Sequence, residues 1–157
     1  DGPSLPELRA PQRAHRRATR VGIVLQSGHL LPFLTAAENV ALAAQLAGAD
    51  ASSTRTTELL GLVGLAERAG HLPRRLSGGE AQRVALAVAL VGSPDLLLAD
   101  EAVGQLDATS AGVVMGTLQR ACREQDLAVL LVTHSPEVAE HGARAAHLVD
   151  GQLQAAA

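Results

Sequence analysis

A short segment spelled Leu-Ser-Gly-Gly-Glu, residues 76–80, holds the residue types best suited to binding a phosphate. Ser77 and Glu80 have the spacing of a capping box, which begins an α-helix. A helix N-terminus offers unpaired backbone N–H groups and a partial positive charge, and Gly78 and Gly79 carry no side chain that would block a phosphate. The segment is therefore either an ordinary helix cap or a phosphate-binding helix terminus.

Polar residues also follow three apolar runs, at residues 21–25, 96–99 and 127–133. Asp100 and Glu101 come directly after the second run. Because successive strand residues point to opposite sides, one carboxylate can hold a metal water shell while the other polarises an attacking water. The alternative is a solvated acidic turn. His134 ends the third run, where a histidine is often only a hydrogen-bonded edge residue, and Gln26 ends the first.

The elements that position these residues follow from the apolar pattern. The three runs indicate strands, and unbroken apolar runs are typical of strands buried on both faces. Asp107 caps a predicted helix, Ser135-Pro136 begins another, and Asp150-Gly151 forms the turn of a hairpin between 145–149 and 152–153. Predicted helices span 35–46, 54–63, 66–69, 77–91 and 108–124. This alternation predicts an α/β architecture with a parallel sheet, in which ligands bind beyond the carboxyl ends of the strands.

Composition narrows the class of protein. The 157 residues are 47% hydrophobic and 18% charged, as in a single globular domain, and no apolar run approaches the roughly 18 residues of a membrane span. A net charge of −3 gives no general attraction to nucleic acid or anionic lipid. The single Cys122 excludes a multi-cysteine metal site. Residues 9–20 hold five arginines; we expect an exposed lead-in to the first strand rather than a nucleic-acid arm or a transit peptide.

In their order, these motifs resemble the nucleotide-binding domain of ABC ATPases, a P-loop NTPase-like α/β fold with a mostly parallel sheet. The resemblance covers nearly the whole chain and implies one partial domain, 1–157. Within it, a helical signature subdomain of about 35–91 would be inserted between two parts of an α/β core, 1–34 and 92–157. The segment 28–40 looks like the branch that serves lipoprotein-release, macrolide-export and cell-division transporters.

The resemblance implies roles at the ends of the strands. Gln26, in the Q-loop, would sense Mg²⁺ and the transmembrane partner. Asp100, at the end of the Walker B strand, would bind the Mg²⁺ water shell. Glu101 would be the general base for water, and His134, in the H-loop, would contact the γ-phosphate of ATP. These roles position and stabilise a phosphoryl group, as expected for P-loop NTPases.

The remaining residues would serve a dimer. The resemblance implies that Ser77, Gly78 and Gly79, together with Glu80 of the same signature, bind ATP held by the opposite subunit. Asp107 would shape the D-loop at the dimer interface. The implied cofactors are ATP and Mg²⁺, and the implied partners are a second ABC ATPase domain and a transmembrane permease, with no nucleic acid. The implied location is cytoplasmic, peripheral on the inner face of the membrane, where the subunit would couple ATP-driven closure to transport.

The sequence also departs from the family pattern. The phosphate cradle G-x-x-x-x-G-K-[ST] should precede Gln26, yet all thirteen basic residues are arginine. A strand, loop and helix need about 30 residues, more than the 20 before Val21. We therefore expect the N-terminal third of the nucleotide site, with its adenine-stacking aromatic residue, to be absent. Ala102 and Val103 replace the usual Pro-Thr, and Val88 replaces a common arginine.

Two rival functions follow from these departures. A degenerate module would donate Ser77 to a partner's ATP without hydrolysing ATP itself; the lack of lysine favours it, whereas Asp1 as first residue favours truncation. A DNA-repair or chromosome-structure ATPase would share the signature and Walker B strand. Those proteins separate the two halves with long coiled coils or zinc modules, whereas Gln26 and Ser77 are 51 residues apart in a chain with one cysteine.

Overall fold

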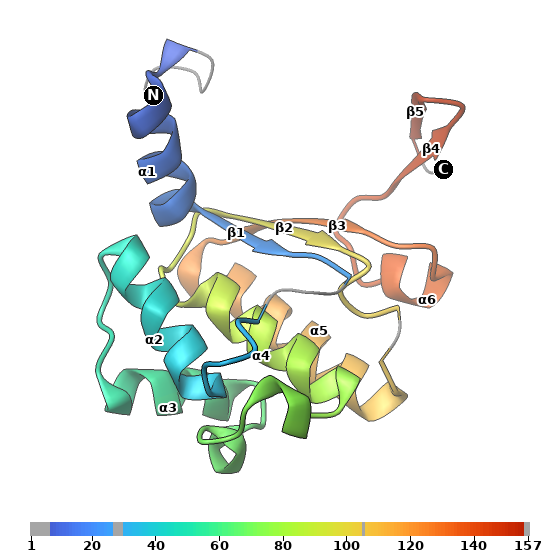
Figure 1. Ribbon diagram of the computed structural model, residues 1–157. Helices are drawn as coiled ribbons and strands as arrows, with labels where there is room; N and C mark the ends of the chain where they lie inside the picture. The colour runs from blue at the N-terminus through green and yellow to red at the C-terminus, as the bar shows by residue number, and fades with distance from the viewer. Residues whose placement is uncertain (1–6, 27–29, 105, 156–157) are drawn as a thin grey trace.

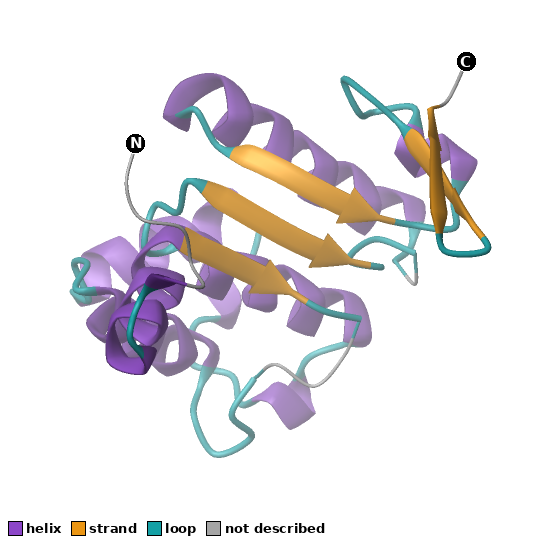
Figure 2. Cartoon of the chain, turned by 90° about the horizontal axis from the view of Figure 1, so that it is seen from above, coloured by secondary structure: helices purple, strands orange, loops and turns teal. Residues whose placement is uncertain are grey.

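Three parallel strands form the sheet that organises the molecule: β1 (Val21–Val24), β2 (Leu96–Asp100) and β3 (Ala128–Val132), in the order β1-β2-β3. The computed structural model describes residues 7–26, 30–104 and 106–155. The register pairs Val24 with Ala99 and Asp100 with Val132, so the three strands end at one edge. Figure 2 shows the three arrowheads along that edge. The predicted parallel sheet is confirmed.

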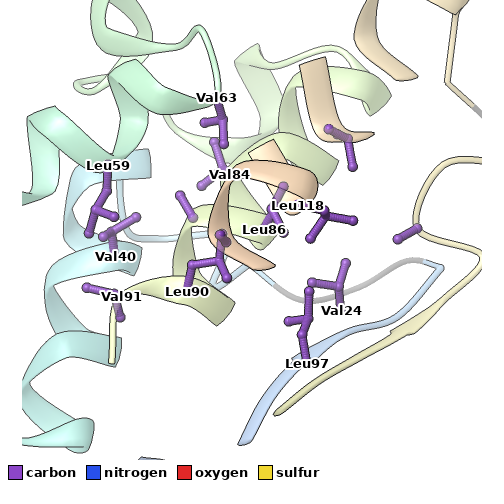
Figure 3. Packing of buried hydrophobic residues seen from close by; sticks show 14 of the residues in the cluster. Val24, Val40, Leu59, Val63, Val84, Leu86, Leu90, Val91, Leu97 and Leu118 are labelled. Carbon is purple, nitrogen blue, oxygen red and sulfur yellow. The ribbon is translucent and has the colours of Figure 1, made fainter. Parts of the chain in front are cut away.

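Four helices lie on one side of the sheet (Figure 1): α2 (Ala36–Ala47), α3 (Ser53–Leu62), α4 (Gly78–Leu90) and α5 (Ala108–Gln125). The α4 and α5 helices contact the strands, and α2 and α3 pack against α4. Side chains from the helices and from that face of the strands meet in one core, which Figure 3 shows around Val24, Leu86 and Leu97. The contact between α4 and β1 is close, because a Cβ added to Gly22 would lie 2.5 Å from the carbonyl oxygen of Ala89. The core therefore fixes α4 against the first strand.

Side-chain caps explain why the sequence predicted where these helices begin. Thr35 accepts from the N–H of Glu38 at 3.2 Å to begin α2, and Ser52 caps α3. Ser77 begins α4 and Asp107 begins α5 in the same way. The predicted short helix at 66–69 is a 3₁₀ turn, η2 (Ala66–Arg68), which is followed by η3 (Pro73–Arg75).

The arginine-rich segment before β1 folds as a helix, α1 (Ala10–Arg20), with none of its residues buried. Its exposure was predicted, but its helical form was not. The composition favours a helix, because alanine, arginine and glutamine are good helix formers and Pro11 stands in the first turn. The exposed ion pair between Arg20 and Asp95, 2.7 Å, anchors the end of α1 next to β2.

The second face of the sheet contradicts the sequence prediction. The strands were expected to be buried on both faces, yet Ile23 is 47% exposed, Leu130 58% and Val132 53%. Figures 1 and 2 show no described helix lying across this face. In β1 and β2 only alternate residues, such as Val24 and Leu97, are therefore buried by the helices, and no residue of β3 is fully buried.

The chain ends in a short helix, α6 (Pro136–Ala139), and an antiparallel hairpin of β4 (Ala146–Val149) and β5 (Gln152–Ala155). The hairpin confirms the prediction around Asp150 and Gly151, which adopt positive φ angles of 49° and 79°. Among the described residues, no helix is both long enough and apolar enough to cross a membrane.

Candidate functional site

Glu101 lies immediately after β2 and is held at both its backbone and its carboxylate. Its backbone N–H donates to the carbonyl oxygen of Val132 at 3.0 Å, and its Oε1 accepts from the backbone N–H of His134 at 2.8 Å. Its φ of 49° lies in the left-handed region, which residues other than glycine rarely adopt. The side chain is 16% exposed. The fold therefore presents this carboxylate at the edge between β2 and β3 in one orientation.

Gly104 fits closely against the same carboxylate. A Cβ added at this position would collide with Oε2 of Glu101, so a larger residue would displace the acid. This contact between Gly104 and Glu101 was not predicted from the sequence. The contact depends on the conformation of the turn after β2, which folds back so that Gly104 faces the side chain of Glu101. No sequence pattern indicates this conformation.

The ring of His134 is available to a ligand. Its side chain is 97% exposed, and Nε2 lies 3.8 Å from Oε1 of Glu101, too far for a direct hydrogen bond. The structure therefore brings His134 and Glu101 together, as the two strand ends suggested, but it does so through the histidine backbone. The imidazole remains exposed beside the carboxylate.

Asp100 and Gln26 lie at the same edge of the sheet. Asp100 is the last residue of β2, and Gln26 is two residues beyond β1, whose Val24 is paired with Ala99. Both side chains are exposed, and no hydrogen bond joins them in the described part of the chain. Residues 27–29, which follow Gln26, lie outside the described residues.

These two side chains fit Mg²⁺ held largely by water and phosphate. Mg²⁺ takes oxygen ligands and is commonly bound through one or two protein groups plus substrate oxygens. Asp100 offers a carboxylate and Gln26 an amide oxygen. No group of three or more His, Cys, Asp or Glu side chains among the described residues forms a complete metal site. The donor set therefore suits a cation that arrives with a phosphate ligand.

The signature segment forms the N-terminus of α4. Oγ of Ser77 accepts from the N–H of Glu80 at 3.1 Å, and the N–H of Ser77 donates to Oε2 of Glu80 at 2.8 Å. Arg68 completes the cluster by donating to Oε1 of Glu80 at 2.9 Å. The backbone bond from Ser77, followed by the bond from Arg68, lowers the pKa of Glu80 below its ordinary value of 4.5. The predicted capping box is confirmed, and Gly78 has open space where a side chain would be.

The α4 helix runs antiparallel to β1. Ala89, near its end, contacts Gly22, whereas Gln82, near its start, donates to the carbonyl oxygen of Leu25 at 3.0 Å. Its N-terminus therefore points beyond the carboxyl edge of β1. Among the described residues, no hydrogen bond joins Ser77 or Glu80 to Glu101 or His134.

The start of α5 lies beside the signature. A Cβ on Gly79 would lie 3.3 Å from Oγ of Ser110, in the first turn of α5. Asp107 caps this helix by accepting from the N–H of Ser110 at 2.9 Å, and this bond lowers the pKa of Asp107. Gln105, two residues before Asp107, lies outside the described residues. The D-loop end and the signature are thus neighbours within one chain.

Comparisons with known proteins agree on one family. Residues 4–104 match the family model described as ABC transporter. The chain is 47% identical over 137 residues to the lipoprotein-releasing system ATP-binding protein LolD of Geobacter metallireducens, which covers 86% of this chain and 61% of the relative. It is 39% identical to the macrolide export ATP-binding/permease protein MacB of Syntrophobacter fumaroxidans, covering 98% of this chain and 22% of that protein.

A solved structure agrees with these relatives. The dimeric ATP-binding cassette MJ0796, in a post-hydrolysis state bound to ADP and Pi, matches with a TM-score of 0.85 and 35% identity. The match covers 94% of this chain and 66% of that one, so the chain spans about two thirds of the length of that cassette. Because the family model covers more than half of the residues and the fold agrees with a solved cassette, the chain belongs to the ABC transporter family.

Proposed function

We propose that these residues form the larger part of the ATP-hydrolysing subunit of a transporter similar to LolD and MacB. In the whole protein, the subunit would bind ATP with Mg²⁺, close against a second cassette, and couple hydrolysis to a transmembrane permease from a peripheral position at the membrane. The identity to both relatives supports this proposal. The division into a helical part, about 35–91, and an α/β core, 1–34 and 92–157, belongs to the same proposal.

The observation that carries the proposal is the restraint on Glu101. The N–H of His134 holds one oxygen of its carboxylate, and the turn at Gly104 closes around the other. A general base must be aimed at the water whose proton it accepts, and these contacts supply that orientation. Glu101 would accept a proton from the water that attacks the γ-phosphate.

The neighbouring residues would complete the electrostatics of phosphoryl transfer. Mg²⁺, when bound, would neutralise charge on the phosphate oxygens. Asp100 and Gln26 would hold its water shell, since both present oxygen atoms at the carboxyl edge. The exposed ring of His134 would donate to a γ-phosphate oxygen. No residue in this arrangement needs to form a covalent bond to the substrate.

The position of the signature supports a shared site. Among the described residues, Ser77 and Glu80 at the start of α4 make no hydrogen bond to Glu101, and a nucleotide at Glu101 would receive the signature terminus of another subunit. Two cassettes arranged head to tail would supply one signature to each nucleotide. The dimeric state of the MJ0796 cassette is consistent with this arrangement.

A further polypeptide segment must supply the phosphate cradle. A strand, loop and helix unit of this kind would also cover the exposed sheet face around Ile23 and Leu130, because parallel sheets are normally covered on both faces. We assign this role to a segment of the whole protein or of a partner. The degenerate module remains the rival, favoured by the absence of lysine from these residues.

The deciding experiment uses the purified protein at its full natural length. Mg²⁺-dependent ATP hydrolysis and ATP-driven dimerisation, both present, would support the proposed motor. No ATP binding, combined with stimulation of a cassette that lacks its own signature serine, would establish the degenerate module instead.

A further inference from the structure

Two side chains, Gln82 and Arg68, join the start of the signature helix α4 to other parts of the chain. Nε2 of Gln82 donates to the carbonyl oxygen of Leu25 at 3.0 Å, across 57 positions of sequence. Nε of Arg68 donates to Oε1 of Glu80 at 2.9 Å. Both bonds act on the first two turns of α4, so both bear on where Ser77 lies.

The two ties lead to different places. Arg68 belongs to η2, and the residues after it are bonded to the first turn of α2, since the N–H of Ala37 donates to the carbonyl oxygen of Ala69 at 2.9 Å. The Arg68 tie therefore remains among the helices. Gln82, by contrast, reaches the sheet, because Leu25 is the residue between the end of β1 and Gln26.

The bond from Gln82 reaches the strand just where its ladder stops. Val24 is the last residue of β1 in the register with β2, so the carbonyl oxygen of Leu25 lies beyond the ladder and accepts from a helix instead. Gln82 is five positions after Ser77, about 7.5 Å along a rigid helix. A displacement of the Leu25–Gln26 backbone would therefore be passed to Ser77 by the helix moving as a unit.

We infer that Gln82 is a positioning residue that couples the strand end carrying Gln26 to the signature helix carrying Ser77. The inference rests on the proposed function for its consequence, since the movement matters only if Ser77 must meet a nucleotide on another subunit. Its structural part does not depend on nucleotide, because the hydrogen bond lies within one chain.

The test compares Gln82→Ala with two controls in the purified protein at its full natural length. Gln45→Ala removes an exposed glutamine from α2, within the same helical layer, and Arg68→Ala removes the other tie. Without nucleotide, amide hydrogen exchange should be about fivefold faster at residues 21–26 in Gln82→Ala only, the effect expected for losing one hydrogen bond. Thermal melting checks that all three variants fold.

The kinetic part tests the coupling itself. Gln82→Ala should lower kcat about tenfold with KM unchanged, because the contact made by Ser77 belongs to the closed dimer rather than to the first binding of ATP. The double variant Gln82→Ala with Gln26→Ala should have the same kcat as whichever of the two single variants is slower. In the double variant of Arg68→Ala and Gln26→Ala, the two fold reductions in kcat should instead multiply, because the Arg68 bond does not involve the strand end that carries Gln26.

Two outcomes would overturn the inference: exchange at 21–26 that is the same in Gln82→Ala and Gln45→Ala, or effects of Gln82→Ala and Gln26→Ala that multiply fully. If the proposed function is wrong, the experiment gives a different result. In that case the wild-type protein would hydrolyse no ATP, while the exchange difference at 21–26 would persist.

Discussion

Glu101 shows how much of a site is decided by the turn that follows it. Glu101→Gln keeps the size of the side chain and an oxygen that can accept from His134, but removes the ability to accept a proton from water. We expect hydrolysis by the full-length protein to slow by roughly 10² to 10⁴ with ATP binding intact, the range for loss of a general base. Single-turnover kinetics and a binding isotherm measure the two quantities. Glu124→Gln on α5 is the control, and unchanged turnover in Glu101→Gln would remove this residue from the role.

Gly104 offers a second test at the scale of the residue. Gly104→Ala would place a Cβ against Oε2 of Glu101 and push the carboxylate out of position. We expect hydrolysis to fall about tenfold or more while ATP binding is retained, because misplacing a catalytic group lowers the rate of the chemical step. Gly116→Ala on α5 is matched, since open space surrounds that glycine, and it should raise stability by about 0.5–1 kcal/mol. Equal activities in the two variants would contradict the close contact seen at Gly104.

Glu80 predicts a pH dependence of stability. Its pKa is lowered in the folded state by the N–H of Ser77 and by Arg68, so the folded protein binds this proton less readily than the unfolded chain does. The stabilisation is complete above the unfolded pKa of about 4.5 and is lost as the pH falls through the folded value. In Glu80→Gln, the decline in Tm between about pH 5 and pH 3 should therefore be shallower than in the wild type. Thermal melts across this range test it, and an equal change in slope for Glu124→Gln would refute it.

At the scale of elements, the sequence predicted what local chemistry determines. The starts of α2, α4 and α5 followed from Thr35, Ser77 and Asp107, because a helix cap involves residues only three positions apart. The strand ends that carry Asp100 and His134 followed from apolar runs. The predicted roles of these residues remain predictions.

What the sequence could not predict depends on contacts between distant segments. The bond from Gln82 to Leu25 joins positions 57 apart and leaves no mark on either local pattern. The helical form of α1 was missed because its arginines were interpreted by charge alone. The exposed face around Ile23 and Leu130 was not predicted, because an apolar strand has the same residue pattern whether or not another segment covers that face.

The N-terminus of α4 permits a test that separates the two interpretations of the signature. Ser77→Arg would put a bulky side chain where a phosphate must approach the N–H groups of Gly78 and Gly79. If the terminus meets ATP on another subunit, dimerisation and hydrolysis should be abolished while the Tm of the monomer barely changes. If Ser77 is only a cap, about 1 kcal/mol of stability is lost and dimerisation continues. Calorimetric melts and ATP-driven dimerisation of the full-length protein measure both, and normal dimerisation with normal hydrolysis would contradict the shared site.

At the scale of the whole molecule, the two faces of the sheet differ in how well they are covered. Helices cover one face, whereas the side chains of Ile23, Leu130 and Val132 are exposed on the other. Among the described strands, β3 has a neighbouring strand on one side only. A parallel sheet in an α/β protein is normally buried on both faces. This exposed face adjoins the carboxyl edge of the sheet, where Gln26, Asp100, Glu101 and His134 follow the ends of the strands. One additional unit of strand, loop and helix would both bury this face and bring phosphate-binding amides to that edge.

If a further segment supplies the phosphate cradle, as proposed, most of the affinity for nucleotide should come from that segment and less from these 157 residues. In the proposed function, Glu101, His134 and Asp100 would act on the γ-phosphate and its metal. The phosphate chain in P-loop NTPases is bound mainly by backbone amides and a lysine, and no lysine is present in these residues. Residues 1–157 alone should bind Mg²⁺-ATP more weakly than about 1 mM, equivalent to no more than about 4.1 kcal/mol. Titration calorimetry on this fragment, with the full-length protein as the positive control and circular dichroism to confirm folding, measures the difference. Micromolar binding by a folded fragment would mean that Gln26, Asp100, Glu101 and His134 hold the nucleotide without a phosphate cradle.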